Sequence, residues 1–441
     1  MNILLLLSSG VASLHSAVTR HASGWLELTL PPQRAAFAGS SCQVNAAGDA
    51  DGLLRQFLAA MDGSDAKGVL LTGSAGNSLC TGGDVHELAE AAKDSVFGPA
   101  RARAFLTLEY AVASRLRELQ PQIPVVSIAD GALMGAGAMM FMSAEHRVAS
   151  SSTVFSLPSC TLGLCPDCGA LDLLTSGAVV PQALGLVLML SGGRLSAEQS
   201  FLGATSGLST QSVESASELE ALRERLLAAP PRCCAEVLSR SAALATAEGP
   251  GRLPSSATAA CILACVESVV QDTHALRNDA AGRIDALQAG LAAKARTADD
   301  AAAAAWLRDA VDALGRGCPA AQVVTYVAGR RASLERQQLR RCHEPAEPDS
   351  EERREETALS QSALGLELAA NSILATRADF LEGASCACGL RCGDQPLWSH
   401  ASRQEAASDP EVTRLVAAML EASPFVLDDP GVRFAAARAL R

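Results

Sequence analysis

The sequence predicts an α/β protein whose first half alternates strands with helices and whose second half is mostly helical. Two observations lead to this prediction. Short apolar runs bounded by glycine or proline recur between residues 24 and 210, and two of them lead through glycine-rich loops into helical segments. From about residue 210 the chain is rich in alanine, leucine and arginine with helical periodicity, so we expect no further strands there.

Composition limits what kind of protein this is. The chain has 441 residues, of which 49% are hydrophobic and 19% charged, so it can bury a large core and form more than one structural unit. A net charge of −12 leaves no overall cationic excess for a nucleic acid backbone or an anionic membrane. The apolar runs are too short to span a bilayer. We therefore expect a globular protein that neither crosses a membrane nor binds nucleic acid through its overall charge.

The fourteen cysteines have no regular spacing, which favours a reducing compartment over a disulfide framework. Two groups of three lie close together in the sequence, Cys160, Cys165 and Cys168, and Cys386, Cys388 and Cys392. Neither group contains the two C-x₂-C pairs of a zinc site, so we expect buried thiols and no metal.

The first strand is predicted at 25–30, where apolar and polar residues alternate before two prolines. Residues 53–61 have helical periodicity, and 67–73 form a short apolar run typical of a buried strand. A glycine-containing loop over 73–84 then leads into a helix, with Asp84 near the helix N-terminus. The predicted order is strand, helix, strand, loop, helix.

A second copy of this arrangement follows. An apolar strand over 124–129 leads into a glycine-rich loop over 130–138 and a helix through Phe141. Further along we expect a strand over 147–156, a loop over 158–169 and helices at 184–190 and 196–202. Two such loops can lie side by side, and two backbone N–H groups aimed at one point form an oxyanion hole suited to acyl transfer. A purely structural role for these glycine turns is the alternative.

Within the helical half, residues 340–357 are dense in charge and lack apolar side chains to bury. The composition predicts a solvated loop, with docking or regulation as an alternative role.

Four segments carry a family resemblance because of their order and spacing: 80–85, 131–140, 158–169 and 190–195. In this order they resemble crotonases, the enoyl-CoA hydratase/isomerase superfamily. The form Gly163-Leu164-Cys165-Pro166-Asp167-Cys168-Gly169, together with residues 378–383, resembles the 3-hydroxyisobutyryl-CoA hydrolase branch. The resemblance covers roughly residues 24–430 and implies a ClpP-like spiral of repeated ββα units with an acyl-CoA site in 24–210, followed by a helical region over 211–441.

The resemblance also implies roles for single residues. The oxyanion-hole donors match the backbone N–H groups of Thr81 and Ala136, the latter standing in place of a glycine. Asp167 matches a retained catalytic acid, whereas Ser159 stands at the position of the acid that takes part directly in thioester cleavage. The substrate-contacting positions match Glu109, Gly82, Gly83, Asp84 and Gly135. No cofactor is implied beyond the CoA of the substrate.

The serine leaves alternatives open, because a hydroxyl needs a base to become a nucleophile. His86 and His146 are candidate bases for Ser159, and Cys160 is a candidate nucleophile in its place. The leading hypothesis is a hydroxyacyl-CoA thioester hydrolase of valine breakdown. One alternative is a non-catalytic scaffold such as a mitochondrial small ribosomal subunit protein. Only in that role would we expect the chain to have a nucleic acid partner. A further alternative is a hydratase or isomerase, although Met139 stands at the position of one catalytic acid of the hydratases.

The compartment expected is the mitochondrion. The first acidic residue is Glu27, and residues 1–23 are a candidate targeting segment, with an ordinary chain terminus as the alternative. The sequence indicates no oligomeric state.

Overall fold

The structure, a computed structural model, describes residues 18–30, 53–63, 65–73, 79–80, 82–94, 96–177, 179–196, 208–244, 257–274, 279–342, 351–387 and 395–421. The expectations stated above for residues 1–17, Thr81, residues 197–202, Cys388 and Cys392 lie outside the described residues.

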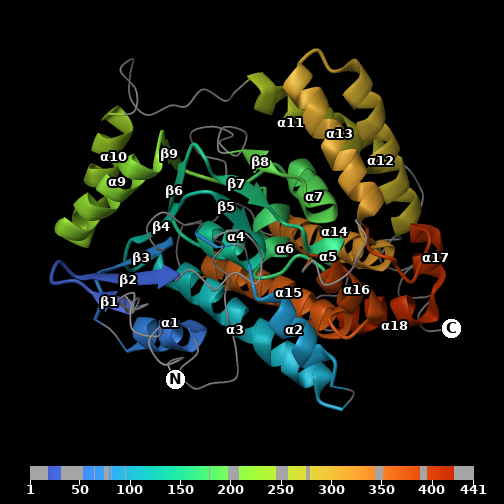
Figure 1. Ribbon diagram of the computed structural model, residues 1–441, viewed down its shortest axis with the longest axis horizontal. Helices are drawn as coiled ribbons and strands as arrows, with labels where there is room; N and C mark the ends of the chain where they lie inside the picture. The colour runs from blue at the N-terminus through green and yellow to red at the C-terminus, as the bar shows by residue number, and fades with distance from the viewer. Residues whose placement is uncertain are drawn as a thin grey trace, which may run out of the picture.

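The larger of two sheets has the strand order β1-β2-β3-β4-β6-β9 (Figure 1). Its strands are β1 (Val18–Arg20), β2 (Trp25–Leu30), β3 (Gly68–Gly73), β4 (Val125–Ala129), β6 (His146–Ser150) and β9 (Gln211–Val213). Only β1 is antiparallel to its neighbour. Both faces are covered, which explains why successive residues of β3 are apolar: Val69 and Leu71 enter one core while Leu70, between them, enters another.

The smaller sheet contains β5 (Ala132–Met134), β7 (Val154–Ser156) and β8 (Leu195–Ser196). The chain steps from the larger sheet to the smaller one twice, from β4 to β5 and from β6 to β7, and each pair leads into a helix. These are repeated ββα units, so the predicted fold class is confirmed. The single strand expected over 147–156 was wrong, because the hydroxyl-rich stretch Ser150–Thr153 makes a turn between β6 and β7.

The helices of the first half are α1 (Leu53–Asp62), α2 (Val85–Ala92), α3 (Gly98–Leu119), α4 (Gly135–Met142), α5 (Ser159–Leu162), α6 (Ala170–Thr175) and α7 (Gln182–Ser191). Helix α2 begins after Asp84 because the Asp84 carboxylate accepts a hydrogen bond from the N–H of Glu87 at 3.0 Å. The loop expected over 158–169 contains the one-turn helix α5, which ends at Gly163 with φ +85°. A single turn is too short to show helical periodicity in a sequence.

The second half consists of α9 (Ala216–Ala228), the 3₁₀ helix η1 (Pro231–Cys233), α10 (Cys234–Leu244), α11 (Ala257–His274), α12 (Ala280–Thr297), α13 (Ala301–Arg316), α14 (Pro319–Cys342), α15 (Glu351–Leu374), α16 (Ala378–Ala387), α17 (Arg403–Ser408) and α18 (Pro410–Glu421). Helices α9 and α10 cover the face of the larger sheet that bears Leu70. Helices α14 and α15 pack on α6, and one apolar core runs from β2 to α18 (Figure 1). Of the helices described, none combines the length and apolarity needed to cross a bilayer.

Two expectations for this half were wrong. Strand β9 lies beyond residue 210 and pairs with β6; three residues are too few to show a period. Both ends of the solvated loop expected over 340–357 are helical, because α14 continues to Cys342 and α15 begins at Glu351, while residues 343–350 lie outside the described part of the chain. Glutamate and arginine have high helix propensity, so a dense run of charge does not exclude a helix.

Candidate functional site

The two glycine loops lie side by side. Cys80 pairs with Leu133 in an isolated parallel bridge, and the Met134 N–H donates to the Cys80 carbonyl at 3.0 Å. Gly82 has φ +101°, and a Cβ built on it would lie 3.3 Å from the Met134 carbonyl oxygen. Gly135 has φ +52°, so both loops need glycine where they meet.

Ala136 is the second residue of α4, so its N–H is among those that a helix leaves without an intrahelical acceptor. A Cβ on Gly82 would lie 3.6 Å from the Ala136 nitrogen, which places this N–H at the junction of the two loops. The positive end of the α4 dipole adds to its attraction for a negative oxygen. Thr81, expected to supply the second donor, lies outside the described residues.

Glu109 lies directly behind the first loop. It belongs to α3 and is 2% exposed, and a Cβ on Gly83 would lie 2.3 Å from its Oε1. Within the described part of the chain, Oε1 has no hydrogen-bond partner. Burial, together with the charges of Asp167 and Glu87, raises the pKa of Glu109 well above its ordinary value. Both effects favour the protonated form of Glu109.

Asp167 and Cys168 join Glu109 at one point. One potential ligand atom from each of the three lies within 4.8 Å of the others. Asp167 remains partly exposed, while withdrawal of its carboxyl group from water raises its pKa to about 7. The Glu109 and Asp167 carboxyl groups therefore titrate as an interacting pair that holds at least one proton at neutral pH.

This cluster is also the group of described residues best placed to hold a metal ion. Burial opposes that use, because it raises the pKa values of the Cys168 thiol and the Glu109 carboxyl group well above their ordinary values, and a metal ion binds the deprotonated forms.

Helix α15 supports the loop that carries Asp167. Glu367 is fully buried, and its carboxylate accepts hydrogen bonds from the N–H groups of Gly169 at 2.8 Å and Leu171 at 2.7 Å. Burial raises the pKa of Glu367 to about 8. Asn371, one turn later, accepts from the Cys165 N–H at 2.9 Å and donates to the Cys165 carbonyl at 2.8 Å. Neither residue was predicted from the sequence, because no motif links them to a loop some 200 positions away.

Arginines brace the other side of this loop. Arg117 of α3 donates to Asp172 of α6 at 3.2 Å, and Arg336 of α14 pairs with the same carboxylate. The Arg117 guanidinium also lies against Gly169, where a Cβ would be 2.7 Å from it. Gly169 has φ +92°, so both its conformation and its contacts require glycine.

Ser159 begins α5 and is 7% exposed. Its carbonyl accepts a hydrogen bond from the Leu164 N–H at 2.9 Å, and Gly163 at the end of the helix packs against the backbone of Asp379. Among the described residues no histidine hydrogen-bonds Ser159: His86 is exposed on α2 and His146 lies on β6.

Cys160 is not the nucleophile that the sequence left open. The residue is fully buried, and its Sγ lies 3.4 Å from the Thr325 Oγ1 of α14. Burial raises the pKa of Cys160 to about 12, so the thiol stays protonated and inert at neutral pH.

Taken together, the residues offer an N–H at a helix N-terminus beside a proton-sharing carboxyl pair. A carbonyl oxygen placed at Ala136 would be polarised, and Asp167 could take a proton from a nearby water molecule. The geometry suits proton transfer at an activated carbonyl.

Comparison with known proteins identifies relatives of this chain. A family model described as enoyl-CoA hydratase/isomerase matches residues 50–345. The mitochondrial 3-hydroxyisobutyryl-CoA hydrolase of Xenopus laevis is 32% identical over 163 residues, which cover 36% of this chain and 38% of that protein. The small ribosomal subunit protein mS47 of Neurospora crassa is 30% identical over 164 residues, which cover 37% of this chain and 30% of that protein. The matched stretches thus cover well under half of these relatives.

Similarity of fold extends further than similarity of sequence. The crystal structure of an enoyl-CoA hydratase from Rhodobacter sphaeroides matches with a TM-score of 0.64 and 20% identity, over 93% of this chain and 99% of that one. At this identity the match concerns the fold alone.

Proposed function

Because this chain belongs to the enoyl-CoA hydratase/isomerase family, we propose that it binds an acyl-CoA thioester at the junction of its two glycine loops and hydrolyses it. The observation that supports this most directly is the short distance between the Ala136 N–H and the acid pair. Gly82 lies beside Ala136, and the next residue, Gly83, lies against Glu109. Glu109 in turn lies beside Asp167.

In the proposed complex, the thioester carbonyl oxygen accepts a hydrogen bond from the Ala136 N–H. The Thr81 N–H is the second donor that the family resemblance implies. Negative charge develops on this oxygen when the carbonyl carbon is attacked, and the N-terminus of α4 stabilises that charge. The Ala136 methyl group replaces a hydrogen atom at this position, which restricts how closely the thioester approaches.

Asp167 is the proposed general base. With a pKa of about 7 it is substantially ionised at neutral pH, so it can remove a proton from water as the water oxygen bonds to the carbonyl carbon. The carbon–sulfur bond then breaks, and the proton passes to the CoA sulfur. Burial favours the protonated form of Glu109, which donates a hydrogen bond to the hydroxyl group of a hydroxyacyl chain.

The substrate proposed is 3-hydroxyisobutyryl-CoA, an intermediate of valine breakdown, and the compartment is the mitochondrion. Both follow from the hydrolase named above as a relative. Apart from the CoA of the substrate, the proposed reaction uses no cofactor.

The experiment is an assay for free CoA thiol released from 3-hydroxyisobutyryl-CoA, paired with calorimetry of the same ligand and of free CoA. The proposal expects binding and turnover. Absence of both heat and thermal stabilisation at about millimolar ligand would contradict it.

A non-catalytic scaffold is the second candidate, and one observation favours it. Ser159 stands where the resemblance places a catalytic acid, and no histidine among the described residues bonds to it. The similarity to a protein of the small ribosomal subunit fits such a role. Co-sedimentation of the chain with mitochondrial small subunits, without acyl-CoA turnover, would support this candidate.

A further inference from the structure

The acid pair has a neighbour that the proposed reaction leaves unused. Tyr110 follows Glu109 on α3, and the residue is 5% exposed. Within the described part of the chain its hydroxyl makes no hydrogen bond. A buried hydroxyl without a partner is unfavourable, because it has lost its water and gained nothing in exchange. The hydroxyl therefore points to a role beyond packing, since phenylalanine would fill the same space without this cost.

The groups that act on this hydroxyl are acidic. Asp167 and Cys168 belong to the loop before α6, and Glu367 belongs to α15, which packs on α3. Of the three, Asp167 acts most strongly. Burial, followed by the charges of Asp167 and Glu367, raises the pKa of Tyr110 well above its ordinary value of about 10. The hydroxyl thus keeps its proton from about pH 5 to about pH 9 and remains a donor throughout this range.

The amide of Asn371 does not occupy the hydroxyl. It already donates to the Cys165 carbonyl and accepts from the Cys165 N–H. Asn371 lies near enough to Tyr110 to lower the tyrosine pKa, but no hydrogen bond of normal geometry joins the two side chains. A hydroxyl hydrogen can rotate about the C–O bond, so it can turn toward a neighbouring group that becomes charged.

The other charged groups near the cluster act elsewhere. Arg117 of α3 pairs with Asp172, and its charge acts on Glu367. Glu87 of α2 acts on Glu109. Helix α4, which also packs on α3, carries no charged side chain. None of these groups hydrogen-bonds the tyrosine hydroxyl within the described residues.

We propose that Tyr110 is a positioning residue for Asp167, whose ionised carboxylate its hydroxyl turns toward and stabilises. The inference rests on the hydrolysis proposed above, in which this carboxylate takes a proton from water. While Asp167 is protonated, the hydroxyl lacks a partner, and when the base ionises the hydroxyl gains one. The change favours ionisation, because a buried donor interacts strongly with a charge where little water competes. Tyr110 thereby makes the base available at lower pH.

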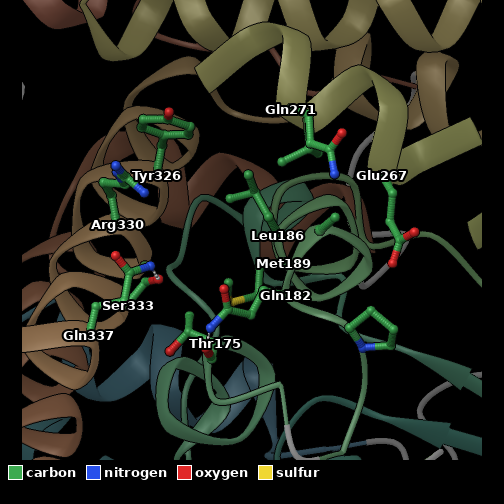
Figure 2. A pocket seen from close by; sticks show the side chains of 14 residues that line it. Thr175, Gln182, Leu186, Met189, Glu267, Gln271, Tyr326, Arg330, Ser333 and Gln337 are labelled. Carbon is green, nitrogen blue, oxygen red and sulfur yellow. Dashed lines mark hydrogen bonds between the residues drawn. The ribbon is translucent and has the colours of Figure 1, made fainter. Parts of the chain in front are cut away.

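Tyr110→Phe removes the hydroxyl and keeps the ring. The chain has two tyrosines, and the second provides a matched control. Tyr326 of α14 is 3% exposed, and its hydroxyl also makes no hydrogen bond within the described residues. It lines a cavity between α7, α11 and α14 (Figure 2), which no residue of the acid cluster lines. Tyr326→Phe therefore makes the same change outside the site.

The first measurement needs no turnover. Urea midpoints of the parent chain and both variants are compared at about pH 5 and about pH 9, on either side of the Asp167 titration. Without the hydroxyl the pKa of Asp167 in the folded state rises further above that of the unfolded chain, so more stability is lost by about pH 9. We expect the deficit of Tyr110→Phe relative to the parent to grow between these pH values, as a shift of about one pH unit in the titration requires. Tyr326→Phe should differ from the parent equally at both.

The second measurement is the pH profile of thioester hydrolysis. In Tyr110→Phe the midpoint of the rise in rate should move up by about one pH unit, while the limiting rate at high pH stays within about threefold of the parent. Tyr326→Phe should keep the midpoint of the parent. A role confined to packing would lower the rate equally at every pH. If the parent itself hydrolyses nothing, the proposed function fails, and the urea measurement still decides whether Tyr110 acts on Asp167.

The Asp167→Asn background identifies the group that the hydroxyl serves. In that background, adding Tyr110→Phe should have no pH-dependent effect on the urea midpoint. Two results would overturn the proposal. One is the same pH dependence in the parent and in Tyr110→Phe. The other is a pH-dependent effect of Tyr110→Phe that persists in the Asp167→Asn background, which would assign the hydroxyl to Glu367.

Discussion

Gly169 donates its backbone N–H to the buried carboxylate of Glu367 at 2.8 Å, although the two residues are 198 positions apart. This contact ties the loop of Asp167 to α15. The candidate active site therefore depends on a helix that contributes none of the residues predicted to contact substrate.

Replacing Glu367 by glutamine should loosen this loop. An amide offers one acceptor oxygen where the ionised Glu367 carboxylate offers two, so at a pH above about 8 the N–H of either Gly169 or Leu171 loses its partner. We expect the free energy of unfolding, measured by urea denaturation, to fall by about 1–3 kcal/mol. The control is Glu224→Gln, at an exposed position of α9, which should change little. Equal stability of the two variants would show that these bonds do not hold the loop.

Stability should fall as pH rises from acid to mildly alkaline. The pKa of Glu367 is raised to about 8 and that of Asp167 to about 7, whereas unfolded carboxyl groups titrate near 4. The folded state thus binds more protons, so the stability associated with these groups is complete below about pH 4 and is lost as pH rises through 7 to 8. Urea midpoints between about pH 5 and 9 would measure this decline.

The double variant Asp167→Asn, Glu367→Gln should show a flatter dependence of stability on pH. Greater stability of the parent chain at alkaline pH than at about pH 5 would contradict the assignment.

Asp167→Asn should reduce thioester hydrolysis by about 10²-fold or more, because it removes the proposed base while keeping the shape of the side chain. The rate of the parent enzyme should rise with pH through about 7 as the acid pair loses its shared proton, and the variant should lack this rise. Asp309→Asn, at an exposed position of α13, is the control. An unchanged rate in the Asp167 variant would place the chemistry elsewhere.

Ser159→Glu should increase hydrolysis by about ten- to a thousandfold, since it restores a carboxylate where the resemblance implies one. Ser159→Gln has nearly the same volume without the charge and should give no gain. The pocket around Ser159 is tight, so the larger side chain must find room near α5.

The double variant Ser159→Glu, Ala136→Gly distinguishes two causes of a low rate, a thioester displaced by the Ala136 methyl group and the lack of an acid at position 159. A displacement of about 1 Å can itself lower the rate by about 10²-fold. A double variant that binds acyl-CoA without turning it over would favour the scaffold candidate.

Sequence alone was sufficient where the cause of a structure is local. The glycine loops depend on the backbone freedom of glycine. The N-terminus of α2 depends on the Asp84 carboxylate, which lies three residues before the N–H that it accepts from. Both causes are visible in a short stretch of sequence. Helix α5 and strand β9 were missed because three or four residues carry no period.

The environment of the site could not be predicted in the same way. The raised pKa values of Glu109 and Cys160 arise from burial by segments distant in sequence. One of these segments is α14, whose Thr325 lies beside Cys160, although the Thr325 hydrogen bond by itself lowers the Cys160 pKa. Glu367 and Asn371 belong to a helix whose glutamate- and leucine-rich sequence does not distinguish it from other helices until its contacts are known.

The apolar core that runs from β2 to α18 has a consequence for the newly made chain. Synthesis proceeds from the N-terminus, so Asp167 leaves the translation machinery about 200 residues before its supports on α15. Until then Gly169, Leu171 and Cys165 lack their side-chain partners, and the apolar faces of α6 and α7 lack their cover. A nascent chain stalled before residue 351 should thus be a client for chaperones, and a truncated protein ending there should not acquire the acid pair in its final geometry.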